Sequence, residues 1–88
     1  MSRVVLELYG IARRRAGREE VAVQAATLGE ALRALAREVP DLEGEVVRDG
    51  ELLADWRANL SGARFVRAAS TPLPPGSRVL ILSAIAGG

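Results

Sequence analysis

The chain closes with residues 78–88, RVLILSAIAGG, and this stretch decides the fold. Its first half is a short, almost entirely apolar run, which is typical of a strand in the centre of a sheet with cover on at least one face. It ends in Gly87 and Gly88, which lack a Cβ and can slide through a channel too narrow for a side chain. The stretch therefore predicts a central strand that runs directly into a flexible tail, residues 84–88.

The glycine pair also predicts where the chemistry takes place. A protein whose own C-terminus reacts needs a bare, narrow end, so we expect the Gly88 carboxylate to be the reacting group and Gly87 to ease its passage. The alternative is a frayed end without a role, because chain ends are often disordered. The remainder of the sequence has to decide between the two interpretations.

Length and composition indicate one domain, residues 1–88. A chain of 88 residues with 49% apolar and 26% charged residues matches an ordinary globular domain and leaves little area for a deep pocket, which argues against a self-contained enzyme. The net charge of +1 gives no support for nucleic-acid binding. The sequence shows no run of about 18 apolar residues and no secretory leader, so we expect no membrane association and a cytoplasmic location.

Three residue types are missing from the sequence, and each absence removes a class of chemistry. Without Cys or His the chain cannot form a disulfide, carry a persulfide, build a thiolate or imidazole metal site, or run Ser-His or Cys-His catalysis. All 12 basic residues are Arg, so no side chain can accept an isopeptide bond or form a Schiff base. We expect no bound metal and no bound cofactor.

The first half of the sequence predicts two strands followed by one helix. Residues 3–9 and 20–24 alternate apolar and polar positions, the period of a half-buried strand, and residues 10–17 are interpreted as a long connector in an antiparallel hairpin. Thr27 and Glu30 have the spacing of a capping box, which predicts a helix that ends at Val39, before Pro40. Its apolar stripe consists of Leu28, Leu32, Leu35 and Val39.

The second half gives weaker signals until the last strand. Residues 41–49 suggest a short helical turn at most, and Asp49-Gly50 is typical of a turn. We expect strands over residues 52–58 and 64–66 with a turn between them, and no regular structure in the Pro-rich residues 71–76. The resulting fold class is α+β, with a mixed sheet of four to five strands and the helix across one face.

Three stretches resemble the MoaD/ThiS family of ubiquitin-like (β-grasp) sulfur carriers. They are LYGIARRRAG at residues 8–17; the Thr-Pro-Leu of residues 71–73 with Gly76 and the start of the last strand; and AIAGG at residues 84–88. The likeness spans nearly the whole chain. Its length and connector look more like MoaD, the small subunit of molybdopterin synthase, than like ThiS.

The resemblance implies a β-grasp fold and a role as a sulfur carrier. A MoeB/ThiF-like enzyme would use ATP to adenylate the Gly88 carboxylate, and sulfur from a persulfide donor would replace AMP to give a thiocarboxylate. As in MoaD, the tail would then insert into a MoaE-like large catalytic subunit and donate sulfur during molybdopterin synthesis. Every catalytic side chain would belong to a partner, so this chain would be the non-catalytic small subunit.

Other functions remain open on the sequence. The same chemistry could deliver sulfur to thiamine thiazole or to a tRNA base, or could join Gly88 to lysines of other proteins as a ubiquitin-like modifier. A plain interaction domain with an accidental glycine pair is a fourth interpretation. The sequence separates the first three poorly, because all of them need a free diglycine end and an adenylating partner.

Side-chain parity along the strands predicts a docking face. If Leu6 and Ile81 face the helix, the alternate residues face away from it, and an apolar patch on an open sheet face is typical of a partner site. The predicted partner-binding residues are Val5, Tyr9, Leu80, Leu82 and, in the tail, Ile85. The run Arg13-Arg14-Arg15 could steer the protein to an acidic partner. Alternatively, a connector or a second copy covers this face, and the arginine run is simply solvated.

Overall fold

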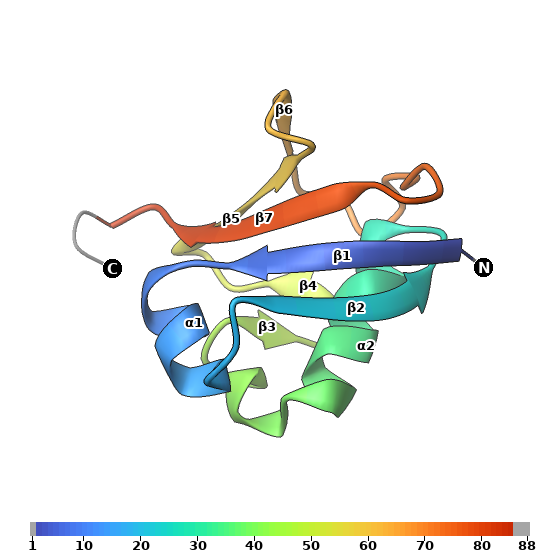
Figure 1. Ribbon diagram of the computed structural model, residues 1–88. Helices are drawn as coiled ribbons and strands as arrows, with labels where there is room; N and C mark the ends of the chain where they lie inside the picture. Colours follow the sequence, from blue (N-terminus) through green and yellow to red (C-terminus); the bar gives the residue numbers. More distant parts are fainter. Residues whose placement is uncertain (1, 86–88) are drawn as a thin grey trace.

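A five-stranded mixed sheet carries both α-helices on one face in the computed structural model, which describes residues 2–85 (Figure 1). The strands are β1 (Ser2–Leu8), β2 (Glu20–Ala25), β5 (Trp56–Leu60), β6 (Arg64–Val66) and β7 (Arg78–Ser83). Their order across the sheet is β2-β1-β7-β5-β6. Only β1 and β7 run parallel, and the other neighbours are antiparallel. This is the α+β class that the sequence pattern predicts and the β-grasp arrangement that the family resemblance implies.

The strand β7 lies in the centre of the sheet, as its apolar run predicts. It pairs with β1 on one side and β5 on the other, and its residues Val79 and Ile81 are fully buried. The side chains that β1 and β2 send to the same face are Val4, Leu6, Leu8, Val21 and Val23. The predicted helical stripe packs against them and is buried as well.

Helix α2 (Leu28–Glu38) begins at the predicted capping box. The Glu30 amide donates to Thr27 Oγ1 at 3.3 Å, and a Glu30 carboxylate oxygen accepts from the Thr27 amide at 3.3 Å. The first two amides of the helix are satisfied by the segment that leads into the Pro-rich residues, because Leu28 donates to Thr71 O and Gly29 to Ala69 O. The helix end at Val39 is also confirmed, since Val39 is its C-cap.

The connector between β1 and β2 is a helix, α1 (Gly10–Ala16), so its interpretation as a long loop is wrong. Gly17 closes the helix in the left-handed region at φ 68°, and its amide donates to Arg13 O. The three arginines lie in the last turn, where positive charge is favourable. Ala12 is its only buried residue, so the helix has no apolar stripe that sequence periodicity could detect.

The predicted strand over residues 52–58 is divided between two sheets. A 3₁₀ turn (Pro40–Leu42) precedes a small hairpin of β3 (Val47–Arg48) and β4 (Glu51–Leu52), whose turn is the predicted Asp49-Gly50. The chain then bends and enters the main sheet as β5, which extends to Leu60. Residues 59 and 60 of the turn predicted over residues 59–62 therefore belong to the strand. The strand at residues 64–66 is confirmed as β6. Among residues 2–85, no helix is long and apolar enough to span a membrane.

Replacement of Gly29 by Val is expected to destabilise the protein by about 1 to 3 kcal/mol, as overpacking commonly does. A Cβ at this position would lie 2.9 Å from Ala69 Cβ and 3.1 Å from Ala69 O, inside the hydrogen-bonded contact that secures the start of α2. Urea unfolding measures the loss. Arg33→Val on the exposed side of the same helix is the matched control, and an equal loss in both variants would contradict the close contact.

Candidate functional site

The two parallel central strands end side by side at the edge of the sheet from which the C-terminal segment leaves. Leu8 lies opposite Ile81, and the Tyr9 amide donates to Ile81 O at 3.1 Å. Residues that follow β1 and residues that end β7 are therefore neighbours, although about 70 residues separate them in sequence. Figure 1 shows α1 and the end of β7 at this same end of the molecule.

Exposed apolar side chains gather at this end. We define the terminal apolar surface as Tyr9, Ile11, Leu82 and Ile85. Tyr9 and Ile11 are each 40% exposed and Ile85 is 56% exposed, while Leu82 is half-buried on the open face of the sheet. Three of these residues are predicted partner-binding residues. Ile11 was missed, because its exposure depends on the unforeseen helix α1.

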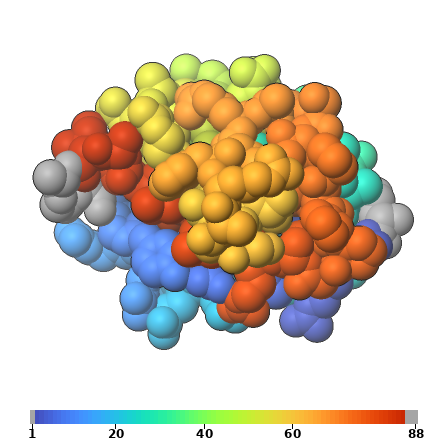
Figure 2. Space-filling model, turned by 90° about the horizontal axis from the view of Figure 1, so that it is seen from above, coloured from blue at the N-terminus to red at the C-terminus, as the bar shows by residue number. Residues whose placement is uncertain are grey.

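The other predicted partner-binding residues, Val5 and Leu80, lie farther along the same open face and are half-buried. Part of this face is occupied by the chain itself: seen from above, the gold and orange segment that includes β6 forms much of the surface (Figure 2). Phe65 of β6 is 63% exposed there and was also missed. Phe65 is therefore a further exposed apolar side chain, separate from the terminal apolar surface.

The start of the predicted flexible tail is held by hydrogen bonds. The Ala84 amide donates to Asp55 O at 2.8 Å, and the Ile85 amide donates to Ser83 Oγ at 3.0 Å. Through Ala84 the segment is bonded to the chain before β5, and the flexibility of residues 84–88 stays a prediction. The predicted reacting residue Gly88 and its neighbour Gly87 lie outside the described residues.

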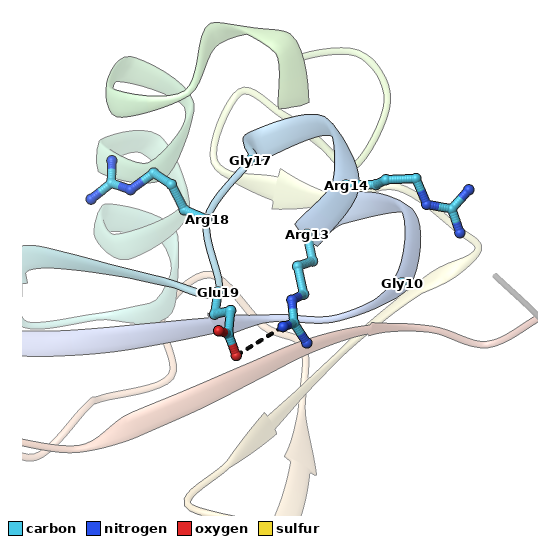
Figure 3. A pocket seen from close by; sticks show the side chains of 6 residues that line it. All are labelled: Gly10, Arg13, Arg14, Gly17, Arg18 and Glu19. Atoms are coloured by element: carbon cyan, nitrogen blue, oxygen red, sulfur yellow. Dashed lines mark ion pairs between the residues drawn. The ribbon is translucent and has the colours of Figure 1, made fainter.

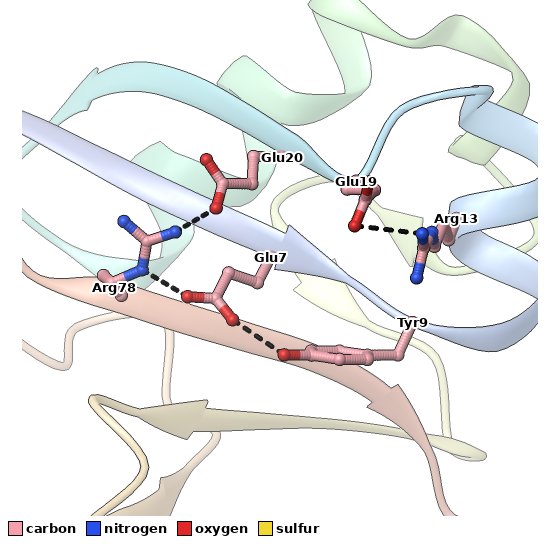
Figure 4. A network of polar contacts seen from close by, with 6 residues as sticks. All are labelled: Glu7, Tyr9, Arg13, Glu19, Glu20 and Arg78. Atoms are coloured by element: carbon pink, nitrogen blue, oxygen red, sulfur yellow. Dashed lines mark hydrogen bonds and ion pairs between the residues drawn. The ribbon is translucent and has the colours of Figure 1, made fainter.

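A polar network crosses the open face next to the terminal apolar surface (Figure 4). Glu7 and Glu20 lie directly opposite each other on β1 and β2, an arrangement of like charges that destabilises a sheet when it is uncompensated. Arg78 of β7 reaches across β1 and pairs with both carboxylates. The Tyr9 hydroxyl donates to the free oxygen of Glu7 at 2.7 Å. Tyr9 is thereby linked through Glu7 to Arg78.

These contacts set the ionisation of the network. The hydrogen bond from Arg78, and next the one from Tyr9, hold the pKa of Glu7 below its ordinary value, although partial burial opposes them. The same bond to Glu7 raises the pKa of Tyr9, because the hydroxyl must keep its proton to donate it. A Glu whose pKa is lowered by folding adds stability above its unfolded pKa, and that stability is lost as the pH falls through the lowered value.

Replacement of Arg78 by Ala is expected to raise the pKa of Glu7, because Arg78 makes the contact that lowers it most, while the Tyr9 hydroxyl continues to lower it. The stabilisation that acid removes through this group should therefore be smaller in the variant than in the wild type. An NMR titration of the Glu7 carboxyl carbon measures the shift, and Arg64→Ala is the control. An unchanged Glu7 titration in Arg78→Ala would contradict the network.

A surface hollow of about 630 Å³ lies beside α1 and is lined partly by Arg13, Arg14 and Arg18 (Figure 3). Arg13 pairs with Glu19 at 2.9 Å, and Arg14 and Arg18 point away from each other. Arg15 of the same run pairs with Glu45 at 3.6 Å. Since these arginines are spread apart and several are paired, the hollow is not a concentrated anion site.

No family model matches the sequence, and no curated protein matches it. Solved structures do match. Small archaeal modifier protein 1 from Haloferax volcanii is 25% identical with a TM-score of 0.83, over 99% of this chain and 100% of that chain. A chain of the BexX/CysO complex from Amycolatopsis orientalis is 20% identical with a TM-score of 0.80, over 97% and 99% of the two chains.

A third match extends the range of functions on this fold. It is a Pyrococcus furiosus protein proposed as subunit 1 of a molybdopterin converting factor, 18% identical with a TM-score of 0.78, over 97% of this chain and 100% of that chain. The chain is therefore structurally similar, over nearly its whole length, to a small archaeal modifier protein, and it shares its fold with the other two matched proteins. Identities of this size, together with a shared fold, leave the reaction itself to be argued from the chain.

Proposed function

We propose that this protein is a sulfur carrier whose reactive group is the carboxylate of Gly88. The observation that carries the proposal is the full-length likeness to small archaeal modifier protein 1, taken together with the diglycine end that follows β7. The central strand delivers the C-terminal segment to one end of the sheet, beside the terminal apolar surface. A partner that docks on that surface therefore meets the reacting end of the chain.

The chemistry needs activation, because a carboxylate is anionic and a poor electrophile. In the proposed sequence a Gly88 oxygen attacks the α-phosphorus of ATP in an adenylating enzyme and releases pyrophosphate. A persulfide then displaces AMP, and a thiol cleaves the resulting acyl disulfide to leave the thiocarboxylate. The ATP, the persulfide and the thiol are all supplied by partners, which agrees with a chain that has no His, Cys or Lys.

We further propose that the sulfur is used in molybdopterin synthesis, with the chain as the small subunit beside a MoaE-like catalytic subunit. The resemblance of residues 8–17, 71–79 and 84–88 to MoaD supports this destination. A second destination is attachment of Gly88 to lysines of other proteins, and the similarity to a small archaeal modifier favours it. Both destinations begin with the same acyl adenylate.

Mass spectrometry tests the shared step. Incubation with ATP, a persulfide donor and the adenylating enzyme of the same organism should add about 16 Da, the difference between sulfur and oxygen in one carboxyl group. No mass change with any such enzyme would overturn the sulfur-carrier proposal. The destinations are then separated by two assays, one for sulfur transfer to a cyclic pyranopterin phosphate in the presence of the large subunit, and one for higher-mass conjugates with other proteins.

A further inference from the structure

The strand β2 is an edge of the sheet, and its outer backbone groups are unpaired. Leu8 donates to Glu19 O, and the antiparallel register continues this set of bonded pairs through Val21 and Val23. Backbone direction alternates along a strand, so the amides and carbonyls of Glu20, Ala22 and Gln24 point away from β1. Within residues 2–85, none of these three residues has a backbone hydrogen-bond partner on that outer side.

The edge borders a hollow of about 510 Å³ between β2 and α2. Ala22, Val23 and Gln24 line it from the strand. Ala34, Arg37 and Glu38 line it from the helix, and Arg3 of β1 completes it. The apolar part of its floor is formed by Val23 and Ala34, which are 6% and 8% exposed. A strand added to β2 would lay every second side chain on this floor and present the others to the open face.

The charges around the edge favour an acidic occupant. Both carboxylates are already compensated, since Glu38 pairs with Arg18 at 3.9 Å and Glu20 pairs with Arg78. Arg3 and Arg37, in contrast, form no ion pair among the residues that the structure describes. Arg3 lies on the open-face side of the edge and Arg37 on the helix side, so cations flank the position of an added strand on both faces.

The position of α2 disfavours a second copy of this chain as the occupant of the edge. The helix packs mainly against β2 and much less against β1, so it lies close beneath the edge. Paired strands are about 4.8 Å apart, whereas packed helices need about 8 to 10 Å between their axes. A two-fold related copy joined at β2 would bring its own α2 into space that is already filled. A single extended segment has no such helix.

We propose that the outer edge of β2, with the hollow against α2, binds an extended acidic segment of a partner protein as a sixth strand. The backbone groups of Glu20, Ala22 and Gln24 form the hydrogen bonds to the added strand. The apolar part of the floor accepts its alternate side chains, and the positive charges of Arg3 and Arg37 favour carboxylates in it. This site lies at the opposite edge of the sheet from β6. It does not depend on the proposed chemistry at Gly88.

A synthetic ten-residue peptide that alternates valine and aspartate is the probe, and its match is a peptide that alternates valine and lysine. We expect saturable binding of the acidic peptide to the full chain, weakened by salt, and little binding of the basic one. Hydrogen exchange locates the peptide. The amides of Glu20, Ala22 and Gln24 should become protected on binding, while those of Val21 and Val23 are protected from the start.

Two pairs of variants test the contacts. Ala22→Pro removes an outward amide without touching the β1 ladder and should weaken binding about tenfold, whereas Ala22→Val keeps the amide and should not. Arg3→Glu should weaken binding, because the aspartates of the bound peptide lie on the open face with Arg3, and Arg33→Glu, with the same change of charge on the outer face of α2, should have little effect.

Three results would overturn the proposal. One is equal binding of the two peptides, or no binding of the acidic one to the wild type. Another is that peptide binding protects backbone amides of β7, which carries Leu80 and Leu82, from hydrogen exchange and leaves those of β2 unchanged. The third is a concentration-dependent dimer that Ala22→Pro abolishes, because a second copy would then occupy the edge.

Discussion

A chain that lacks Gly88 is expected to gain no sulfur at all under conditions that convert the wild type completely. Deletion of Gly88 moves the terminal carboxylate onto Gly87 and shortens the segment that must reach the adenylating site. Because positioning of reacting atoms governs the rate of such a transfer, a shift of one residue places the carboxylate out of reach of the ATP phosphorus. Mass spectrometry after incubation with ATP, the adenylating enzyme and a persulfide donor reads out the loss.

The fold should survive this deletion. Every core residue that the structure describes lies between Val4 and Ile81, so the stability change should stay within about 0.5 kcal/mol, as for changes away from buried contacts. Gly87→Leu is a companion variant that keeps the Gly88 carboxylate but adds a side chain, and it should also block transfer. A large fall in melting temperature on deletion would mean that the end of the chain is packed, and the account of a reacting arm would be wrong.

Loss of the Tyr9 ring or the Leu82 side chain is expected to weaken binding of the adenylating enzyme by about 1 to 4 kcal/mol each, the range for anchor residues in interfaces. This corresponds to about 5- to 1000-fold in the dissociation constant. Both residues belong to the terminal apolar surface, and Tyr9 is additionally held by its hydrogen bond to Glu7. Calorimetric titration of Tyr9→Ala and Leu82→Ala, each shown to be folded, measures the effect.

Arg33→Ala, on the outer face of α2, is the control for the same titration and should bind like the wild type. Equal losses in all three variants would mean that this end of the sheet is not the interface. Leu82 is half-buried, so its variant needs a stability measurement before its affinity is interpreted. Ile11→Ala extends the test to the residue that the sequence did not single out.

The anchored start of the C-terminal segment limits where a partner can place its reaction centre. Ala84 is bonded to Asp55, so the part of the segment that can extend freely begins at Ile85. The three residues from Ile85 to Gly88 span at most about 10 Å. While the bond to Asp55 persists, the adenylating pocket must therefore approach the terminal apolar surface closely.

Local sequence patterns determined most of the fold. Periods of two at residues 3–9 and 20–24, the Thr27–Glu30 capping box and the apolar run of β7 each depend only on near neighbours, and the structure confirms all of them. The set of buried residues followed directly, because the period of the side chains along a strand or helix identifies the face that is buried. The predicted docking residues came from the same parity, and Gly88 came from the diglycine end alone.

Helix α1 and the hairpin of β3 and β4 were not predictable in this way. The seven residues of α1 bury only Ala12, and two-residue strands are too short to show a period. A signal for α1 was present in the sequence, because an arginine run followed by Gly17 is typical of the C-terminal end of a helix. The composition of the segment nevertheless suggested a loop.

Tertiary structure alone decided which distant residues meet and which edges stay open. Arg78 pairs with Glu7 across 71 positions of sequence, and nothing local to either residue indicates it. The free backbone groups of β2 likewise depend on the order β2-β1-β7-β5-β6, which puts that strand at an edge. The physical reason is that periodicity encodes the burial of each residue, whereas neighbours across a sheet depend on strand order, which the chain acquires only when it folds.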